Sequence, residues 1–156
     1  MDIHAQKAKA FFQQGYNCAQ AVLLAFGDET GLSPELAARL ASSFGGGMGR
    51  MREVCGTLSG AFMAAGAICG YSDPAARTEK AEHYARIQRI AAAFRAENGS
   101  IICRELLRGP EAHDTAPTPD ARTAEYYRKR PCVELVGCAA EILARELARA
   151  DEPNEG

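Results

Sequence analysis

The sequence predicts an all-α protein, a compact bundle of about six to seven helices around a central helix rich in glycine and alanine. Two observations indicate this class: apolar residues recur at three- and four-residue spacing in alanine-rich stretches, and alternating β-branched runs are missing. A third observation locates the central helix, because residues 54–71 hold no charged side chain. We expect residues 1–150 to form a single domain and residues 151–156 to be a frayed tail.

The central segment, residues 41–71, begins with a glycine loop at residues 45–49 and runs into the uncharged stretch. Glycine inside a helix costs roughly 1 kcal/mol relative to alanine, so we expect neighbouring helices to pack closely against the small residues. A membrane span is the alternative, since a bilayer needs about 20 apolar residues. Gly, Ser and Thr dilute the stretch, and no second such segment exists. A buried helix in a protein outside the membrane is therefore expected.

Helices are also predicted before the central one from their capping residues and periodicity. Residues 2–14 form an amphipathic helix. Asn17 is a good N-cap for a second helix over residues 18–26. Ser33, followed by a proline, starts a third helix over residues 34–44, which leads into the glycine loop.

Further helices are predicted after the central one, over residues 74–97, 101–108, 118–127 and 131–150. Ser100 is the expected cap of the second of these. The segment 109–119 contains three prolines and is the one long loop. It has two interpretations, a lid or a mobile surface loop.

The composition restricts the function classes. The formal net charge is −2, and Lys and Arg are scattered among Asp and Glu, which leaves no basic face for nucleic acid. Charged residues near the N-terminus stand where a secretory signal has its apolar core, so a cytoplasmic protein is expected. In that compartment six cysteines are expected to be thiols, metal ligands or catalytic groups, not permanent disulfides.

Four of the cysteines fall at predicted helix starts. Cys18, Cys103 and Cys132 lie in first turns, and Cys55 follows the glycine loop near a fourth start. Free backbone N–H groups and the helix dipole favour the thiolate there, which lowers the thiol pKa from about 8.5 toward 7 or below. Metal binding and thiol exchange both require the thiolate. The alternative is that each cysteine packs as a small hydrophobic residue.

The other two cysteines are expected to be structural. Cys69 lies about 21 Å from Cys55 along a continuous helix, too far for a disulfide. Cys138 is rotated by roughly 120° from Cys132 on the last helix. The chain has no C-x-x-C of the thioredoxin, zinc-ribbon or ferredoxin kind and no C-x-x-C-H. Any site must therefore be assembled from separate segments.

Five short segments carry the glycine loop and the four cysteines that lie at predicted helix starts. They are GYNCAQAV at 15–22, FGGGMG at 44–49, CGTLSG at 55–60, ICREL at 102–106 and CVELV at 132–136. In combination they resemble the C_GCAxxG_C_C family of redox proteins, over about residues 10–147. The resemblance implies that these are the four signature cysteines of the family, and Thr57 stands where the family usually has alanine. A related region resembles split-Soret-type cytochromes, in which an iron–sulfur centre is associated with these cysteines, and this implies a metal cluster.

The glycine loop has two interpretations. Its N–H groups, with Arg50, could hold an anion. The candidate cofactor-binding residues are Gly47, Gly49 and Gly56. The loop matches neither the P-loop nor the dinucleotide fingerprint, and no predicted strand precedes it. A packing role against Cys18 or Cys103 is the favoured interpretation.

Three hypotheses for function follow. In the first, Cys18, Cys55, Cys103 and Cys132 are ligands of an iron–sulfur cluster, or of zinc, in electron transfer with an unidentified redox partner. In the second, the protein carries no metal and exchanges thiols and disulfides. Its candidate catalytic thiols are Cys55, which the glycine loop leaves accessible, and Cys18. In the third, the protein is a helical scaffold, as a homodimer, whose cysteines only pack.

Overall fold

The computed structural model describes residues 2–150 and confirms the all-α prediction. Within those residues it has nine α-helices, two short 3₁₀ helices and no strand. The count exceeds the predicted six to seven, and three of the helices have six residues or fewer, of which the first had no predicted counterpart. These are α3 (Gly27–Thr30), α7 (Cys103–Leu107) and α8 (Ala124–Lys129). The predicted frayed tail, residues 151–156, lies outside the described part.

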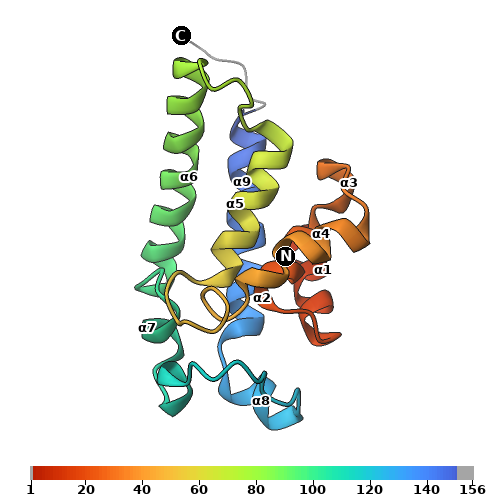
Figure 1. The fold of residues 1–156 in the computed structure, drawn as a ribbon, viewed down its shortest axis with the longest axis vertical. Helices are drawn as coiled ribbons and strands as arrows, with labels where there is room; N and C mark the ends of the chain where they lie inside the picture. Colours follow the sequence, from red (N-terminus) through yellow and green to blue (C-terminus); the bar gives the residue numbers. More distant parts are fainter. Residues whose placement is uncertain (1, 151–156) are drawn as a thin grey trace.

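The core lies between four helices that contact one another. They are α1 (Ile3–Gln13), α2 (Cys18–Ala25), α5 (Gly56–Cys69) and α9 (Cys132–Ala150). The long α6 (Arg77–Asn98) packs against α5 and α9, and all three run along the long axis of the molecule (Figure 1). α4 (Pro34–Ala41) packs against α2 and continues into the 3₁₀ helix Ser42–Phe44.

Close packing of α5 against α2 explains its small residues. A Cβ atom at Gly60 would stand 2.5 Å from the carbonyl oxygen of Ala19 in α2, so only glycine fits there. Ala61, Ala64 and Ala65 on the same helix are fully buried. The predicted packing of neighbouring helices against the glycine-rich segment is therefore confirmed. None of the helices in residues 2–150 combines the length and the apolar character needed to cross a bilayer.

Several predicted boundaries are wrong, and local hydrogen bonds give the reasons. α6 begins at Arg77, not near residue 74, because Asp73 and Pro74 form a turn in which the Asp73 carboxylate accepts from the amide of Ala75. α8 begins only at Ala124, because the Thr123 hydroxyl caps it by accepting from the amide of Tyr126. Ser100 does not cap α7. Its hydroxyl accepts instead from the amide of Ile102, one residue before the helix starts.

Candidate functional site

Each of the four signature cysteines stands at the beginning of a different helix. Cys18, Cys103 and Cys132 are the first residues of α2, α7 and α9, and Cys55 is the N-cap of α5. The predicted placement at helix starts is therefore confirmed for all four.

Local hydrogen bonds place the first of these starts. The side chain of Asn17 accepts from the amide of Gln20 at 2.8 Å, and the Gln20 side chain accepts from the amide of Asn17 at 2.9 Å. This reciprocal pair is a capping box, which fixes the first turn of a helix. It makes Cys18 the first helical residue.

Two segments that are distant in sequence pair through their backbones and bring Cys55 and Cys103 together. Val54 and Ile102 form an isolated antiparallel bridge. Beside it, the amide of Cys55 donates to the carbonyl of Ile101 at 2.8 Å, and the amide of Cys103 donates to the carbonyl of Glu53. These backbone bonds hold the start of α5 against the start of α7.

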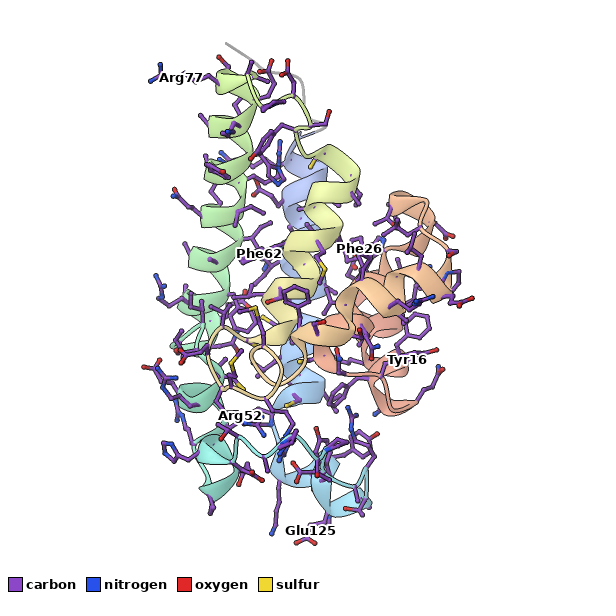
Figure 2. The ribbon with its side chains drawn as sticks, in the orientation of Figure 1. Tyr16, Phe26, Arg52, Phe62, Arg77 and Glu125 are labelled. Atoms are coloured by element: carbon purple, nitrogen blue, oxygen red, sulfur yellow. The ribbon has the colours of Figure 1, made fainter. Side chains whose placement is uncertain are left out.

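All four cysteines line one cavity of about 320 Å³. Cys55 is 5% exposed and Cys103 8%, whereas Cys18 and Cys132 are partly buried. Figure 2 places Arg52, which lines the same cavity, beside the loop that precedes α5. The sequence-predicted set is therefore assembled in one place, from four helix starts.

The glycine loop packs against Cys103, and Gly56, the first residue of α5, packs against Cys18. A Cβ at Gly47 would meet the Cβ of Cys103 at 2.6 Å, and Gly47 also has φ +66°, which favours glycine. A Cβ at Gly56 would collide with the sulfur of Cys18. Gly49 and Gly56 line the cavity, while Gly47 lies behind Cys103. The contacts are those expected of a loop that packs on the cysteines.

The predicted lowering of the thiol pKa values is wrong for three of the cysteines. Burial raises the pKa of Cys18 and Cys55 above the ordinary value, and it raises that of Cys132 to about 12. Loss of water disfavours the charged thiolate, and the neighbouring Cys18 raises the pKa of Cys55 and Cys132 further. Desolvation therefore outweighs the N–H groups at the helix starts.

The expectation that Cys55 is accessible is also wrong. Its side chain is almost completely buried, and its sulfur lies 3.1 Å from the hydroxyl oxygen of Thr57, which is itself 1% exposed. Cys55 belongs to the apolar core of the protein, which explains its lack of access.

Four arginines, which we call the arginine wall, also line the cavity, and sequence analysis identified only the first of them. They are Arg50, Arg52, Arg122 and Arg130. Arg122 donates at 3.0 Å to the carbonyls of Phe12 and Tyr16, and its guanidinium carbon lies 4.3 Å from the ring centre of Phe12. Arg52 stands shortly after the glycine loop, so the position of that loop in the sequence could have pointed to Arg52 as a site residue. Arg122 and Arg130 carry no such local signal, since only the tertiary structure brings them to the cavity.

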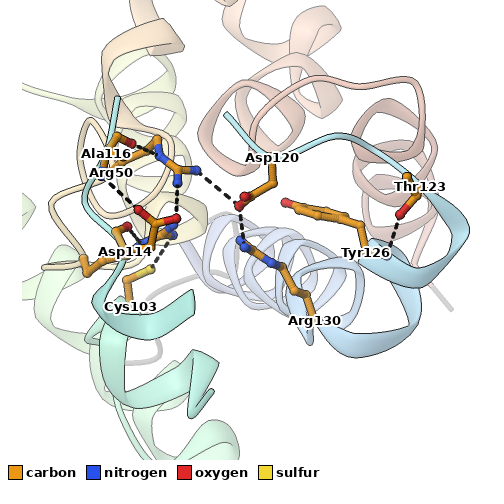
Figure 3. A network of polar contacts seen from close by, with 9 residues as sticks. Arg50, Cys103, Asp114, Ala116, Asp120, Thr123, Tyr126 and Arg130 are labelled. Carbon is orange, nitrogen blue, oxygen red and sulfur yellow. Dashed lines mark hydrogen bonds and ion pairs between the residues drawn. The ribbon is translucent and has the colours of Figure 1, made fainter. Parts of the chain in front are cut away.

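The segment 109–123, which we call the strap, carries Arg122 of the arginine wall and is fastened to two others, Arg50 and Arg130. Asp120 pairs with Arg50 at 3.4 Å and with Arg130 at 2.5 Å (Figure 3). Arg50 also pairs with Asp114 at 3.3 Å and donates to the carbonyl of Ala116. Pro117, Pro119 and Asp120 line the cavity. Of the two interpretations of the loop, these contacts favour a cover over the cavity.

Asp120→Asn is expected to loosen the strap, because it leaves Arg50 and Arg130 without their shared carboxylate. Their side chains are 14% and 10% exposed, and that of Asp120 is 37% exposed, so we expect the free energy of unfolding to fall by about 1–2 kcal/mol. The cavity thiols should also react faster with a thiol reagent. Urea unfolding and timed thiol labelling would measure both effects.

The loss of stability caused by Asp120→Asn should vanish in acid. Partial burial alone would raise the pKa of Asp120, but Arg130 and Arg50 outweigh it and hold that pKa below its ordinary value. The stabilisation is therefore present above the unfolded-state pKa of about 3.9 and is lost as the pH falls through the lower folded-state pKa. The matched control is Asp28→Asn, since Asp28 is 92% exposed and pairs with Lys7 at 3.7 Å. Equal results for the two variants at neutral pH would contradict the prediction.

The remaining cysteines lie away from the cavity. The Cys69 sulfur donates to the carbonyl of Ala65 at 3.2 Å. The Cys138 sulfur donates to the carboxylate of Glu97 at 2.9 Å, and burial followed by this hydrogen bond raises the pKa of Cys138 to about 11. All six cysteines are free thiols. Across residues 2–150, no three side chains of the His, Cys, Asp and Glu types stand close enough together to hold a metal ion.

Comparison with known proteins identifies the family. A family model described as "Putative redox-active protein (C_GCAxxG_C_C)" matches residues 16–146, a span that includes all four cysteines of the cavity and most of the chain. No curated protein and no solved structure shows significant similarity to the chain. The protein therefore belongs to the C_GCAxxG_C_C family of redox-active proteins.

Proposed function

We propose that Cys18, Cys55, Cys103 and Cys132 hold an iron–sulfur cluster that serves one-electron transfer, with zinc as the alternative metal. One observation carries the proposal: four cysteines from four separate helix starts line the same cavity. Four cysteine thiolates are the usual ligand set of [2Fe–2S] and [4Fe–4S] clusters, and soft sulfur ligands also suit zinc.

The charge of the cavity fits such a centre. Four guanidinium groups line the cavity, and two carboxylates, Asp114 and Asp120, pair with them, which leaves an excess of two positive charges (4 − 2). Four thiolates around a core or ion of charge 2+ carry a net charge of 2−. The arginine wall would offset that charge in surroundings from which water is largely removed.

The spacing of the thiols favours a cluster over a single ion. Zinc binds each thiolate at about 2.3 Å and so requires its ligands to converge on one point. No such group exists in the described part of the chain, while the four thiols line, together with other side chains, a cavity of about 320 Å³. A cluster of several atoms uses that space with less movement of the helices than one ion requires.

The protein's own residues prepare the site for negative charge. Backbone N–H groups hydrogen-bond the sulfurs of Cys18 and Cys55, and these groups favour thiolates once a cation offsets the cost of burial. Because burial raises the thiol pKa values, assembly must release protons from the cysteines. When bound, a cluster would supply a centre that takes up and returns one electron. The strap restricts access of water to it.

The thiol–disulfide hypothesis has less support. An attacking thiolate needs exposure and a pKa near the ambient pH. Cys55, its leading candidate, is buried, and burial raises its pKa.

Anaerobic purification followed by iron, zinc and acid-labile sulfide analysis tests the proposal. Iron and sulfide in matching amounts, with visible absorption that bleaches on reduction, are the expected result. Zinc at one per chain would select the alternative metal. A metal-free protein whose thiol count falls by two or four on mild oxidation would overturn the proposal in favour of thiol exchange. A metal-free protein with an unchanged thiol count would favour the scaffold.

A further inference from the structure

Arg52 is a buried cation with an incomplete set of partners. Its side chain is 3% exposed and lines the cavity. Nε donates to the carbonyl of Asp114 at 3.0 Å, and Nη1 lies 3.8 Å from the sulfur of Cys103, within the range of a hydrogen bond to sulfur. Nη2 is buried and has no partner among the described residues. A buried guanidinium with an unused donor is costly unless an anion stands beside it.

The other arginines of the wall are engaged differently. Arg50 and Arg130 pair with carboxylates of the strap. Arg122 donates to two backbone carbonyls and lies against an aromatic ring. Among the described arginines of the cavity, Arg52 is the one with a hydrogen bond to a cysteine sulfur. No carboxylate among the described residues pairs with Arg52, and its guanidinium is hydrogen-bonded to a proposed ligand.

We propose that Arg52 is a positioning residue that sets the reduction potential of the centre through its hydrogen bond to the Cys103 sulfur. This inference rests on the proposed function. Reduction adds one electron to the centre, and no proton has to move because an arginine side chain keeps its charge. A positive hydrogen-bond donor stabilises the more negative, reduced state, and hydrogen bonds to the ligand sulfurs are known determinants of cluster potential. Arg52 therefore raises the potential.

The same hydrogen bond lowers the reactivity of Cys103. A sulfur lone pair that accepts from Arg52 is less available to an electrophile than the sulfurs without a cationic donor. Thr57 contacts the Cys55 sulfur in a similar way, but its hydroxyl is neutral. We therefore expect Thr57 to influence the reduction potential less than Arg52 does.

The test compares Arg52→Gln, Arg52→Lys and Thr57→Ala, with Arg50→Gln as the matched control. Arg50→Gln removes the same charge from the same wall without touching a sulfur, and because it also releases Asp114 and Asp120 of the strap, its shift in potential is an upper limit for the loss of one wall charge. In an anaerobic redox titration of the iron-loaded proteins, we expect Arg52→Gln to lower the equilibrium constant for reduction at least tenfold, which is 59 mV for one electron. Arg52→Lys should keep a potential between those of Arg52→Gln and the wild type. Thr57→Ala and Arg50→Gln should shift the potential less than Arg52→Gln does.

A second measurement does not depend on electron transfer. In zinc-loaded protein, alkylation by iodoacetamide followed by peptide mass spectrometry should show faster modification of Cys103 relative to the other three cysteines in Arg52→Gln.

The outcomes separate the inference from the function on which it rests. Wild-type protein that binds neither iron nor zinc overturns both. Full metal content with an unchanged potential in Arg52→Gln, or a shift no larger than that of Arg50→Gln, overturns the role of Arg52 and leaves the metal centre standing. Loss of all metal from Arg52→Gln would also overturn it, because Arg52 would then be needed for assembly.

Discussion

Serine at any one of positions 18, 55, 103 or 132 is expected to lower the metal content of anaerobically purified protein at least tenfold. Each substitution removes one of four thiolates from the cavity and leaves a hydroxyl that is far harder to deprotonate and binds iron or zinc weakly. Changes to residues that only support a ligand already cost 10–100-fold in affinity. Iron, zinc and sulfide per chain, with the visible spectrum, are the measurements.

Cys69→Ser and Cys138→Ser are the matched controls for this set. Both residues lie on long helices but outside the cavity, with hydrogen bonds to Ala65 and Glu97. They should keep the metal content of the wild type. Far-ultraviolet circular dichroism would show that each variant keeps its helices. The metal centre is refuted if the four signature variants match these two controls.

Gly56→Ala is the second substitution with a large expected effect, although it adds only a methyl group. Its Cβ would collide with the Cys18 sulfur and would stand 2.6 Å from the carbonyl oxygen of Phe44. Because Gly56 is the first residue of α5, the collision would push the start of α5 away from the start of α2. We expect the free energy of unfolding to fall by about 1–3 kcal/mol. Less than half of the wild-type metal should remain.

Gly66→Ala is the control on the same helix. Gly66 is exposed, and a Cβ there would have no atom within 4 Å. Alanine is the better helix former by about 1 kcal/mol, so this variant should gain stability and keep its metal. Urea unfolding and metal analysis of the two variants measure the contrast. Equal metal content in both would show that the Cys18 sulfur can move aside without loss of the site.

The parts of the fold that depend on local signals were predictable. Asn17 and Gln20 form a capping box within four residues of sequence, so the start of α2 at Cys18 follows from neighbouring side chains. The start of α8, in contrast, could not be predicted from neighbouring residues. Both Thr118 and Thr123 are acceptable caps, and the strap, which is attached to Arg50, holds the first of them in a bend outside any helix. Local sequence does not distinguish the two.

The thiol pKa values also depend partly on local sequence and partly on the tertiary structure. Helix starts lower a thiol pKa when the thiol meets water, and the sequence placed those starts at or close to the four cysteines. Whether water is present depends on parts of the chain that are distant in sequence, such as Pro117 and Pro119 of the strap, which line the same cavity as the cysteines. The burial that reverses the direction of the shift is therefore a tertiary property.

The sequence by itself determined the all-α class, the small-residue helix and the four helix starts that carry Cys18, Cys55, Cys103 and Cys132. These features depend on periodicity, capping and side-chain size, which act over a few residues. Only the tertiary structure decided that the four thiols share one buried cavity and that Arg52 and the other arginines face them. Those relations join residues up to 114 positions apart (132 − 18), and they arise because helices from both ends of the chain pack on α5.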